Sequence, residues 1–327
     1  MDALHRVRLI TAIAMGVVIA GAADATYAEQ TYPSKPVRIV VPFTPGGTSD
    51  VLARTLGAKL SEMWGEAVVI ENRTGAGGTI GTGLVAKATP DGHTLLISSA
   101  AFVISAAVHD HLPYDITKDF SGITRLGFST TALITSPSTG VKTVKELVDL
   151  AKAKPNQLIY SHAGVGSSTF MNGERFKLAS GIKARSVGFK GAADAQLEVV
   201  AGRVHCAIVG LASSLPFIKD GRLIALAMGT SQRSHILPDV PTLAETLPGY
   251  ARDGSHSMVA PKGTPQAILT KISQDVKRVL EMPDVKQRLE NIDFVAAPTT
   301  PDEHNRIIRA DLRTFTGVVQ LAGLRPK

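Results

Sequence analysis

The sequence has very few cysteine and aromatic residues. Cys206 is the only cysteine among 327 residues, and Phe, Trp and Tyr together account for 5% of the chain. Because a single cysteine cannot form an internal disulfide, the fold must be stabilised by its hydrophobic core. Cys206 lies in the apolar run VHCAIV, which predicts a buried strand.

The sequence also lacks the signatures of common catalytic and metal sites. It contains no GxSxG elbow, no HExxH motif and no paired cysteine and histidine spacing. We therefore expect no catalytic residue, no metal site and no cofactor. The alternative is an enzyme on a similar α/β scaffold, for example a small-molecule hydrolase.

Basic residues exceed acidic ones, but they are not concentrated. The formal net charge is +7 at pH 7, and the lysines and arginines are scattered along the chain. Nucleic-acid binding needs a basic cluster, commonly with aromatic residues between the charges. We therefore expect no nucleic-acid partner, and a modest positive field favours small anionic solutes.

Long apolar runs are absent after the N-terminal segment. Arg6 and Arg8 precede an apolar run from Leu9 to about Ala23, and small residues follow up to Ala28. This pattern predicts a secretory signal peptide over residues 1–28, cleaved after residue 25 or 28. The run is short for a membrane span, so a retained anchor is the weaker alternative.

The remainder alternates strand-like runs with amphipathic helical stretches, which predicts an α/β fold of parallel sheets covered by helices on both faces. Two extended segments, Ile123–Thr135 and Gly254–Ala260, are interpreted as crossings between two domains. The first domain would contain residues 29–130 and 256–327, and the second would contain residues 131–255. Two crossing strands and a discontinuous first domain describe the type II periplasmic binding-protein fold, with the ligand cleft between the domains.

A glycine-containing turn follows the first predicted strand, Val37–Val41. The chain passes through PFTPGG and enters a helix near Ser49, with Thr48 or Ser49 as its cap. Unpaired N–H groups at such a turn favour a small anion. The turn has no lysine to reach a phosphate, so it is not a P-loop.

The segment Tyr160–Thr169 has the same pattern in the second domain. A strand ends at Tyr160, glycines turn the chain, and Ser167 and Ser168 start a helix. The segment is either a second set of ligand donors or an ordinary helix cap. The other glycine run, Gly75–Gly81, has the spacing GxGxxxG, which argues against a dinucleotide site.

Six segments, taken in order, carry a family resemblance. They are VPFTPGGTSDVLAR, ENRTGAGGTIGTGLVAKATPDGHTLL, YSHAGVGSST, GFKGAADAQLEVVAGRV, LPDVPTLAE and APKGTP. The chain resembles the Bug family, also called TctC-like proteins, which are extracytoplasmic receptors of tripartite tricarboxylate transporters. The resemblance implies a monomeric periplasmic receptor for a small carboxylate, with membrane transporter subunits as partners. A ligand-sensing module for a signalling receptor is a further alternative.

The resemblance also implies where the ligand binds. Residues expected on the first lip of the cleft are Phe43, Thr44, Gly46, Gly47, Ser49, Ser98 and Ser99. Residues expected on the second lip are His162, Gly166, Ser167, Ser168 and Lys190.

Several positions depart from the family pattern. The family usually has a small residue at position 162, so His162 either meets a ligand carboxylate or is a structural histidine. Family acids are replaced by His205 and Val209, which argues against an amino-acid ligand because its ammonium group would lack a partner. Ser255 and His256 stand where many members have an aromatic residue.

Overall fold

The computed structural model describes residues 32–248, 250, 254–321, 323 and 324. The helices and strands belong to one compact unit, Lys35–Lys327, while Met1–Ser34 is a separate unit. The predicted signal peptide, residues 1–28, lies outside the described residues. Within the described ranges, no helix combines the length and the apolar character needed to cross a membrane.

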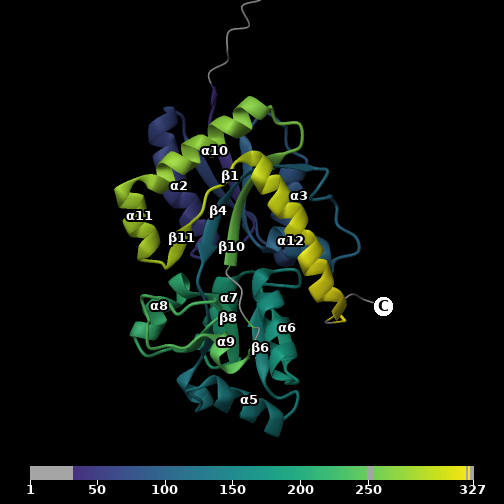
Figure 1. Cartoon of the computed structure of the whole chain (residues 1–327), viewed down its shortest axis with the longest axis vertical. Helices are drawn as coiled ribbons and strands as arrows, with labels where there is room; N and C mark the ends of the chain where they lie inside the picture. The colour runs from purple at the N-terminus through teal and green to yellow at the C-terminus, as the bar shows by residue number, and fades with distance from the viewer. Residues whose placement is uncertain (1–31, 249, 251–253, 322, 325–327) are drawn as a thin grey trace, which may run out of the picture. The chain divides into compact units, whose positions relative to one another are not determined.

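A six-stranded sheet has the strand order β11-β4-β10-β3-β1-β2. Strands β1, β4, β10 and β11 of this sheet are labelled in Figure 1. Its strands are β1 (Val37–Val41), β2 (Val68–Asn72), β3 (Thr94–Ser99), β4 (Phe120–Ser129), β10 (Gly254–Pro261) and β11 (Phe294–Ala296). The accompanying helices are α2 (Thr48–Trp64), η1 (Ala76–Gly78), α3 (Thr79–Ala86), α4 (Ala101–Val108), α10 (Gln266–Glu281), α11 (Pro283–Glu290) and α12 (Pro301–Leu321). We call this sheet and these helices lobe 1.

A five-stranded sheet has the strand order β7-β6-β8-β5-β9. Its strands are β5 (Thr131–Thr135), β6 (Ile159–His162), β7 (Arg185–Gly188), β8 (Cys206–Gly210) and β9 (Ile224–Met228). The accompanying helices are η2 (Pro137–Thr139), α5 (Val144–Ala153), α6 (Ser168–Ser180), α7 (Ala192–Val200), α8 (Leu211–Lys219) and α9 (Leu243–Thr246). We call this sheet and these helices lobe 2.

Both sheets are mixed, so the interpretation as parallel sheets is wrong in part. In lobe 1, β1 is parallel to β2 and β3, but β10 is antiparallel to β3 and β4. In lobe 2, β6 is parallel to β7 and β8, but β5 is antiparallel to β8 and β9. Strand β5 receives the chain directly from the end of β4 in the other sheet. It therefore runs away from that end, in the direction opposite to its neighbours β8 and β9.

The chain changes sheet between β4 and β5. Only Thr130 separates Ser129, the last residue of β4, from Thr131, the first residue of β5. Gly254–Ala260, interpreted from the sequence as the second crossing, lies within β10 and pairs with β3 and β4 of the six-stranded sheet, so this segment does not itself pass between the sheets. The chain returns from lobe 2 before Gly254, and residues 251–253 are outside the described residues.

Strand β8 supplies both faces of the lobe 2 core. Cys206 and Ile208 belong to one hydrophobic cluster, whereas Ala207 and Val209 belong to another. This division follows from the alternation of side chains along a strand. Cys206 is fully buried and free, as predicted, and burial raises the pKa of its thiol to about 12.

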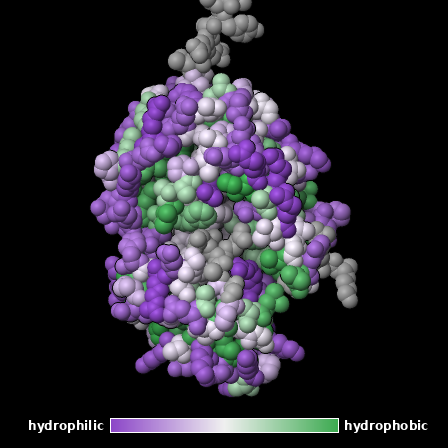
Figure 2. All heavy atoms as spheres, viewed as in Figure 1, coloured by the Kyte–Doolittle hydropathy of each residue, from purple (hydrophilic) through white to green (hydrophobic). Residues whose placement is uncertain are grey.

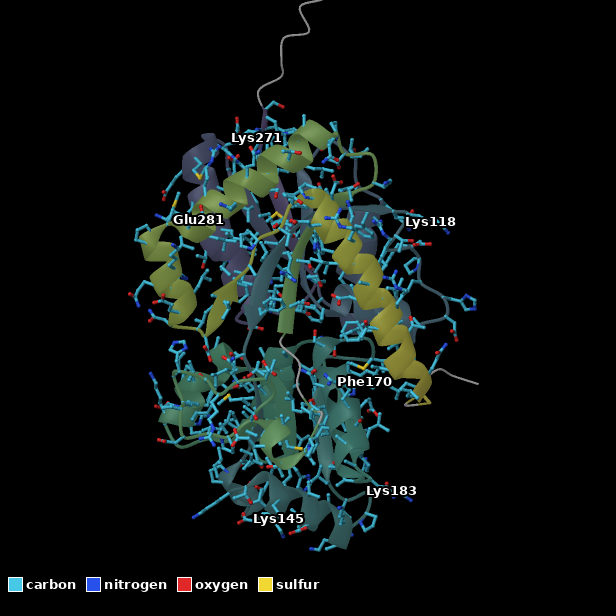
Figure 3. The ribbon with its side chains drawn as sticks, viewed as in Figure 1. Lys118, Lys145, Phe170, Lys183, Lys271 and Glu281 are labelled. Carbon is cyan, nitrogen blue, oxygen red and sulfur yellow. The ribbon has the colours of Figure 1, made fainter. Side chains whose placement is uncertain are left out.

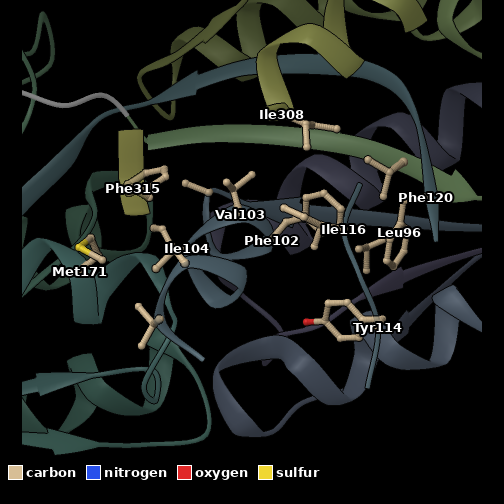
Figure 4. Packing of buried hydrophobic residues seen from close by; sticks show 14 of the residues in the cluster. Leu96, Phe102, Val103, Ile104, Tyr114, Ile116, Phe120, Met171, Ile308 and Phe315 are labelled. Atoms are coloured by element: carbon tan, nitrogen blue, oxygen red, sulfur yellow. The ribbon is translucent and has the colours of Figure 1, made fainter. Parts of the chain in front are cut away.

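One hydrophobic cluster draws residues from both lobes. Figure 4 shows Phe315 of α12 and Ile104 of α4 near Met171 of α6, and all three belong to one cluster of buried side chains. Apolar packing therefore extends from lobe 1 onto the first turn of a lobe 2 helix.

Charged side chains lie at the outer surface. Lys118 and Lys145, labelled in Figure 3, have side chains that are 80% and 81% exposed. Figure 2 shows hydrophilic residues over much of the face in view, with smaller hydrophobic areas between them. At these two positions the positive charge is solvated and does not form a buried basic cluster.

Candidate ligand-binding site

The loop after β1 leads into α2, whose first backbone N–H groups receive no side-chain cap. Gly47 is the N-cap residue, and no side chain accepts a hydrogen bond there. The expectation that Thr48 or Ser49 caps this helix is wrong, because the helix already begins at Thr48. The Asp50 N–H donates to the Gly47 carbonyl at 2.9 Å, so the N–H groups of Thr48 and Ser49 are the ones in this turn that remain for a ligand.

Asp50 holds this loop in position. Its carboxylate accepts hydrogen bonds from the Gly46 backbone N–H, from Arg54 Nε and from Asn72 Nδ2, each at 3.0 Å. Burial acts to raise the pKa of Asp50, but these hydrogen bonds and the Arg54 charge outweigh it, so the pKa is lowered. The charge of Asp50 is thus paired within its own loop.

The loop after β6 leads into α6 in a similar way. Ser167 is the N-cap, and its side chain accepts a hydrogen bond from the Phe170 N–H at 3.1 Å. Gly164 and Gly166 have φ values of 95° and 85°, which side-chain-bearing residues rarely adopt. The glycines make this turn possible, as the sequence pattern indicated.

A cavity of about 90 Å³ lies where four helices begin. The N-caps of α2, α6, α7 and α8 are Gly47, Ser167, Gly191 and Gly210, and the three glycine caps have no side-chain acceptor. Gly47, Ser167 and Gly210 line the cavity, as does Ala192, the first residue of α7. Helix N-termini favour negative charge, so their convergence suits an anion.

The cavity wall combines hydroxyl groups with apolar side chains. Its residues are Phe43, Thr44, Gly47, Thr48, Ser49, Asp50, Ser99, Ala100, Ile104, Ser129, Thr131, Ala163, Ser167, Ser168, Thr169, Asn172, Ala192, Ile208, Val209, Gly210, Ser213, Gly254, His256 and Phe315. Among these described residues there is no lysine or arginine. Attraction for an anion must come from backbone N–H groups and hydroxyls.

The two lobes touch beside the cavity. Ser99 Oγ lies 2.8 Å from Ser168 Oγ, and Ser105 Oγ donates a hydrogen bond to the Gly166 carbonyl at 3.3 Å. Gly77 lies against the Val165 carbonyl so closely that an added Cβ would be 2.0 Å from that oxygen. These contacts hold the cavity walls together.

His256 connects two serines at the cavity wall. Its Nδ1 lies 3.2 Å from Ser49 Oγ, and its Nε2 lies 3.0 Å from Ser129 Oγ. The side chain is buried, and burial lowers the pKa of His256 to about 4. A Ser–His pair can act in nucleophilic catalysis, but an imidazole with this pKa is a weak base near neutral pH, and Ser129 replaces the usual carboxylate.

The structure brings together seven of the twelve residues expected at the ligand. Those that line the cavity are Phe43, Thr44, Gly47, Ser49, Ser99, Ser167 and Ser168. They come from both lobes, as expected for a cleft. Their contact with a ligand remains a prediction.

The other five expected residues do not line the cavity. The Gly46 N–H is bonded to Asp50, and Ser98 is buried in the sheet opposite Ser257. The Gly166 carbonyl accepts the Ser105 hydroxyl, and Lys190 is exposed at the surface.

His162 is the fifth of these residues. Its Nδ1 accepts a hydrogen bond from the Gly164 N–H at 3.1 Å, and its ring packs edge-on against Phe170. Burial lowers the pKa of His162. Of the two interpretations of His162, these contacts favour the structural one.

His205 also lies away from the cavity. Its Nδ1 accepts a hydrogen bond from the Ile159 N–H, and it lines a different depression together with Lys154 and Gln157. Its non-acidic character therefore says nothing about the ligand. Val209 does line the cavity, so the argument against an amino-acid ligand depends on this position alone.

Several cavity residues were missed by the sequence analysis. Ser129, Thr131 and Gly210 lie where strands change sheet or end, and Phe315 comes from the last helix. A strand end followed by a helix was the available signal for Gly210. No local signal marks Phe315.

The fold and the cavity define a class of protein, a solute-binding protein of the type II periplasmic kind. The structure is similar to that of periplasmic binding protein BugD, with a TM-score of 0.87 and 28% identity over 90% of this chain and 100% of that one. It is also similar to R. palustris Rpa4515 with adipate, with a TM-score of 0.87 and 32% identity over 90% and 100% of the two chains.

MatC (Rpa3494) from Rhodopseudomonas palustris with bound malate gives a TM-score of 0.82 and 28% identity over 88% and 100% of the two chains. Protein BugT from Bordetella pertussis is 31% identical over 99% of this chain and 100% of its own length. The family model of the tripartite tricarboxylate transporter family receptor, TctC, matches residues 52–324. The chain belongs to this receptor family.

Proposed function

We propose that this protein is a periplasmic receptor that captures a small carboxylate and delivers it to the membrane subunits of a tripartite tricarboxylate transporter. The observation that carries the proposal is the convergence of four helix N-termini on one cavity, three of them capped only by glycine. Adipate and malate in the two related structures support a carboxylate.

We further propose export by a cleaved signal peptide and action as a monomer. The two domains would be residues 29–130 with 256–327, and residues 131–255. The basic residues and the apolar run before Ala28 support export. Sequencing of the periplasmic protein should find an N-terminus near residue 26 or 29; an intact Met1 in the soluble fraction would contradict processing.

Gly47 allows a sharp test of the anion site. Its φ of −76° suits any residue, and an added Cβ would meet only the Thr44 carbonyl, at 3.9 Å. Gly47→Asp should cap α2 and preserve or slightly raise stability, while its charge and its occupation of the N–H groups abolish carboxylate binding. Gly47→Asn, the uncharged control, should weaken binding less.

The assay is a thermal-shift screen over mono-, di- and tricarboxylates, followed by calorimetry on the acids that stabilise the wild type. Carboxylate binding that survives in Gly47→Asp with undiminished affinity would contradict the proposed site. Turnover assays on esters and nucleotides address the enzyme alternative. Loss of solute uptake on deletion would separate a transporter receptor from a sensor module.

A further inference from the structure

The hydrogen bonds around His256 form a continuous chain along the cavity wall. Ser49 Oγ contacts His256 Nδ1 at 3.2 Å, His256 Nε2 contacts Ser129 Oγ at 3.0 Å, and Ser129 Oγ donates to the Gly254 carbonyl at 3.2 Å. All four residues line the cavity. The chain of hydrogen bonds links the first turn of α2 to the end of β4 and the start of β10, next to the point where the polypeptide leaves the six-stranded sheet.

Proton counting assigns a direction to each of these contacts. His256 is 4% exposed and neutral near pH 7, so its ring carries one proton. A carbonyl oxygen can only accept, so the Ser129–Gly254 contact requires the Ser129 hydroxyl proton; we assign it there, which makes Ser129 Oγ the acceptor for His256 and places the ring proton on Nε2. Nδ1 then accepts the hydroxyl proton of Ser49. The opposite tautomer would leave the Ser129–Gly254 contact without a proton.

The Ser49 oxygen consequently offers only lone pairs to the cavity. A carboxylate or keto oxygen of a ligand would be repelled by the partial negative charge of Ser49 Oγ, whereas a ligand hydroxyl group would donate a hydrogen bond to it. The carboxylate of a ligand would be held instead by the N–H groups at the helix N-termini.

We propose that His256 determines specificity by fixing the Ser49 hydroxyl as a hydrogen-bond acceptor, so that the receptor selects a short hydroxycarboxylate. This inference rests on the proposed function, which supplies the carboxylate. The cavity of about 90 Å³ is smaller than the roughly 150 Å³ that accommodates benzene in an engineered protein cavity, and this comparison favours an acid with a short carbon chain.

Matched acids test the inference by calorimetry. Lactate and pyruvate share a carbon skeleton and differ in hydroxyl against keto group, and 2-hydroxybutyrate and 2-oxobutyrate extend the comparison by one carbon. The wild type should bind the hydroxy acid of a pair about tenfold more tightly than the keto acid. His256→Phe frees the Ser49 proton, so the preference should fall below twofold or reverse.

Ser129→Ala provides a second variant in case His256→Phe does not fold. It removes the acceptor for Nε2–H, so the ring proton is free to move to Nδ1 and the preference for the hydroxy acid should again weaken. A preference of the same size in the wild type and in the folded variants would overturn the inference. Equal binding of both acids by the wild type would also overturn it.

The tautomer can be measured without any ligand. Nitrogen-15 NMR of the histidine side chains, with the His256 signal assigned by its loss in His256→Phe or its shift in Ser129→Ala, should show the proton on Nε2. A proton on Nδ1 would overturn the inference. If no carboxylate binds, the proposed function fails, whereas binding without hydroxyl discrimination contradicts only the role of His256.

Discussion

Closure of the cavity should depend on the absence of a side chain at Gly77. An alanine there would place its Cβ 2.0 Å from the Val165 carbonyl oxygen and 3.1 Å from the carbonyl carbon. Ordinary contact begins at 3.4 Å, so the two loops must separate by about 1.4 Å (3.4 − 2.0). That movement breaks the nearby contacts between the lobes.

The magnitude follows from those contacts. The hydrogen bonds Ser99–Ser168 and Ser105–Gly166 connect the lobes beside this point, and each contributes about 1 kcal/mol. Losing both disfavours the closed state by about 2 kcal/mol, and binding that requires closure weakens by about 30-fold. Calorimetry with a carboxylate that binds the wild type measures this loss.

Gly65→Ala is a matched control. Gly65 has a φ of 69°, close to the 66° of Gly77, but an added Cβ there would meet nothing within 4 Å. Both alanine variants should lose about 1 kcal/mol of stability from backbone strain, and only Gly77→Ala should lose affinity. Wild-type affinity in Gly77→Ala would show that the loop yields locally, and the reasoning about closure would be refuted.

His162→Ser should leave the pH dependence of ligand affinity between pH 6 and 8 unchanged in calorimetry, because burial lowers the pKa of His162 and keeps the ring neutral; a flattened profile would restore ligand contact. His304→Leu should reduce acid sensitivity. Burial lowers the pKa of His304 to about 3. Between pH 6.5 and 3 the unfolded chain therefore binds a proton that the folded protein does not, and the free energy of unfolding falls by roughly 1.4 kcal/mol per pH unit of acidification. Urea unfolding at pH 7 and 4.5 measures this, and parallel losses in both proteins would contradict it. Tyr160→Phe should cost about 1–3 kcal/mol in urea unfolding, because the hydroxyl donates to the Thr169 carbonyl and accepts from the Ile208 N–H; a loss below about 0.5 kcal/mol would be inconsistent with this.

Local sequence signals predicted the parts of the site that depend on local geometry. The sequence predicted the strand Val37–Val41 and the turns before α2 and α6. A buried apolar run followed by glycines and hydroxyl residues is compatible with few structures other than a strand, a turn and a helix start. The crossing from β4 to β5 was readable for a similar reason, since Ile123–Thr135 is an extended apolar segment without a helical period.

The remainder depends on contacts between distant segments. The sequence of helix α4, AFVISAAV, gives no amphipathic period, because the helix is buried on nearly every side, so no local pattern predicts it. The position of Phe315 follows from the packing of α12, and the bridge from Ser49 to Ser129 follows from the pairing of β10 with β4. The orientation of His162 was likewise decided by its neighbours Gly164 and Phe170.

Because Cys206 is buried, this receptor is suited to site-specific labelling with a fluorescent dye that reports ligand binding. Its thiol is inaccessible and, with a pKa of about 12, almost entirely protonated at the pH of ordinary maleimide labelling. As it is the only cysteine in the chain, a thiol introduced elsewhere would be the single reactive one without any prior substitution. A dye attached to an exposed position beside the cavity would then report occupancy as a fluorescence change, in a protein whose own core remains unaltered.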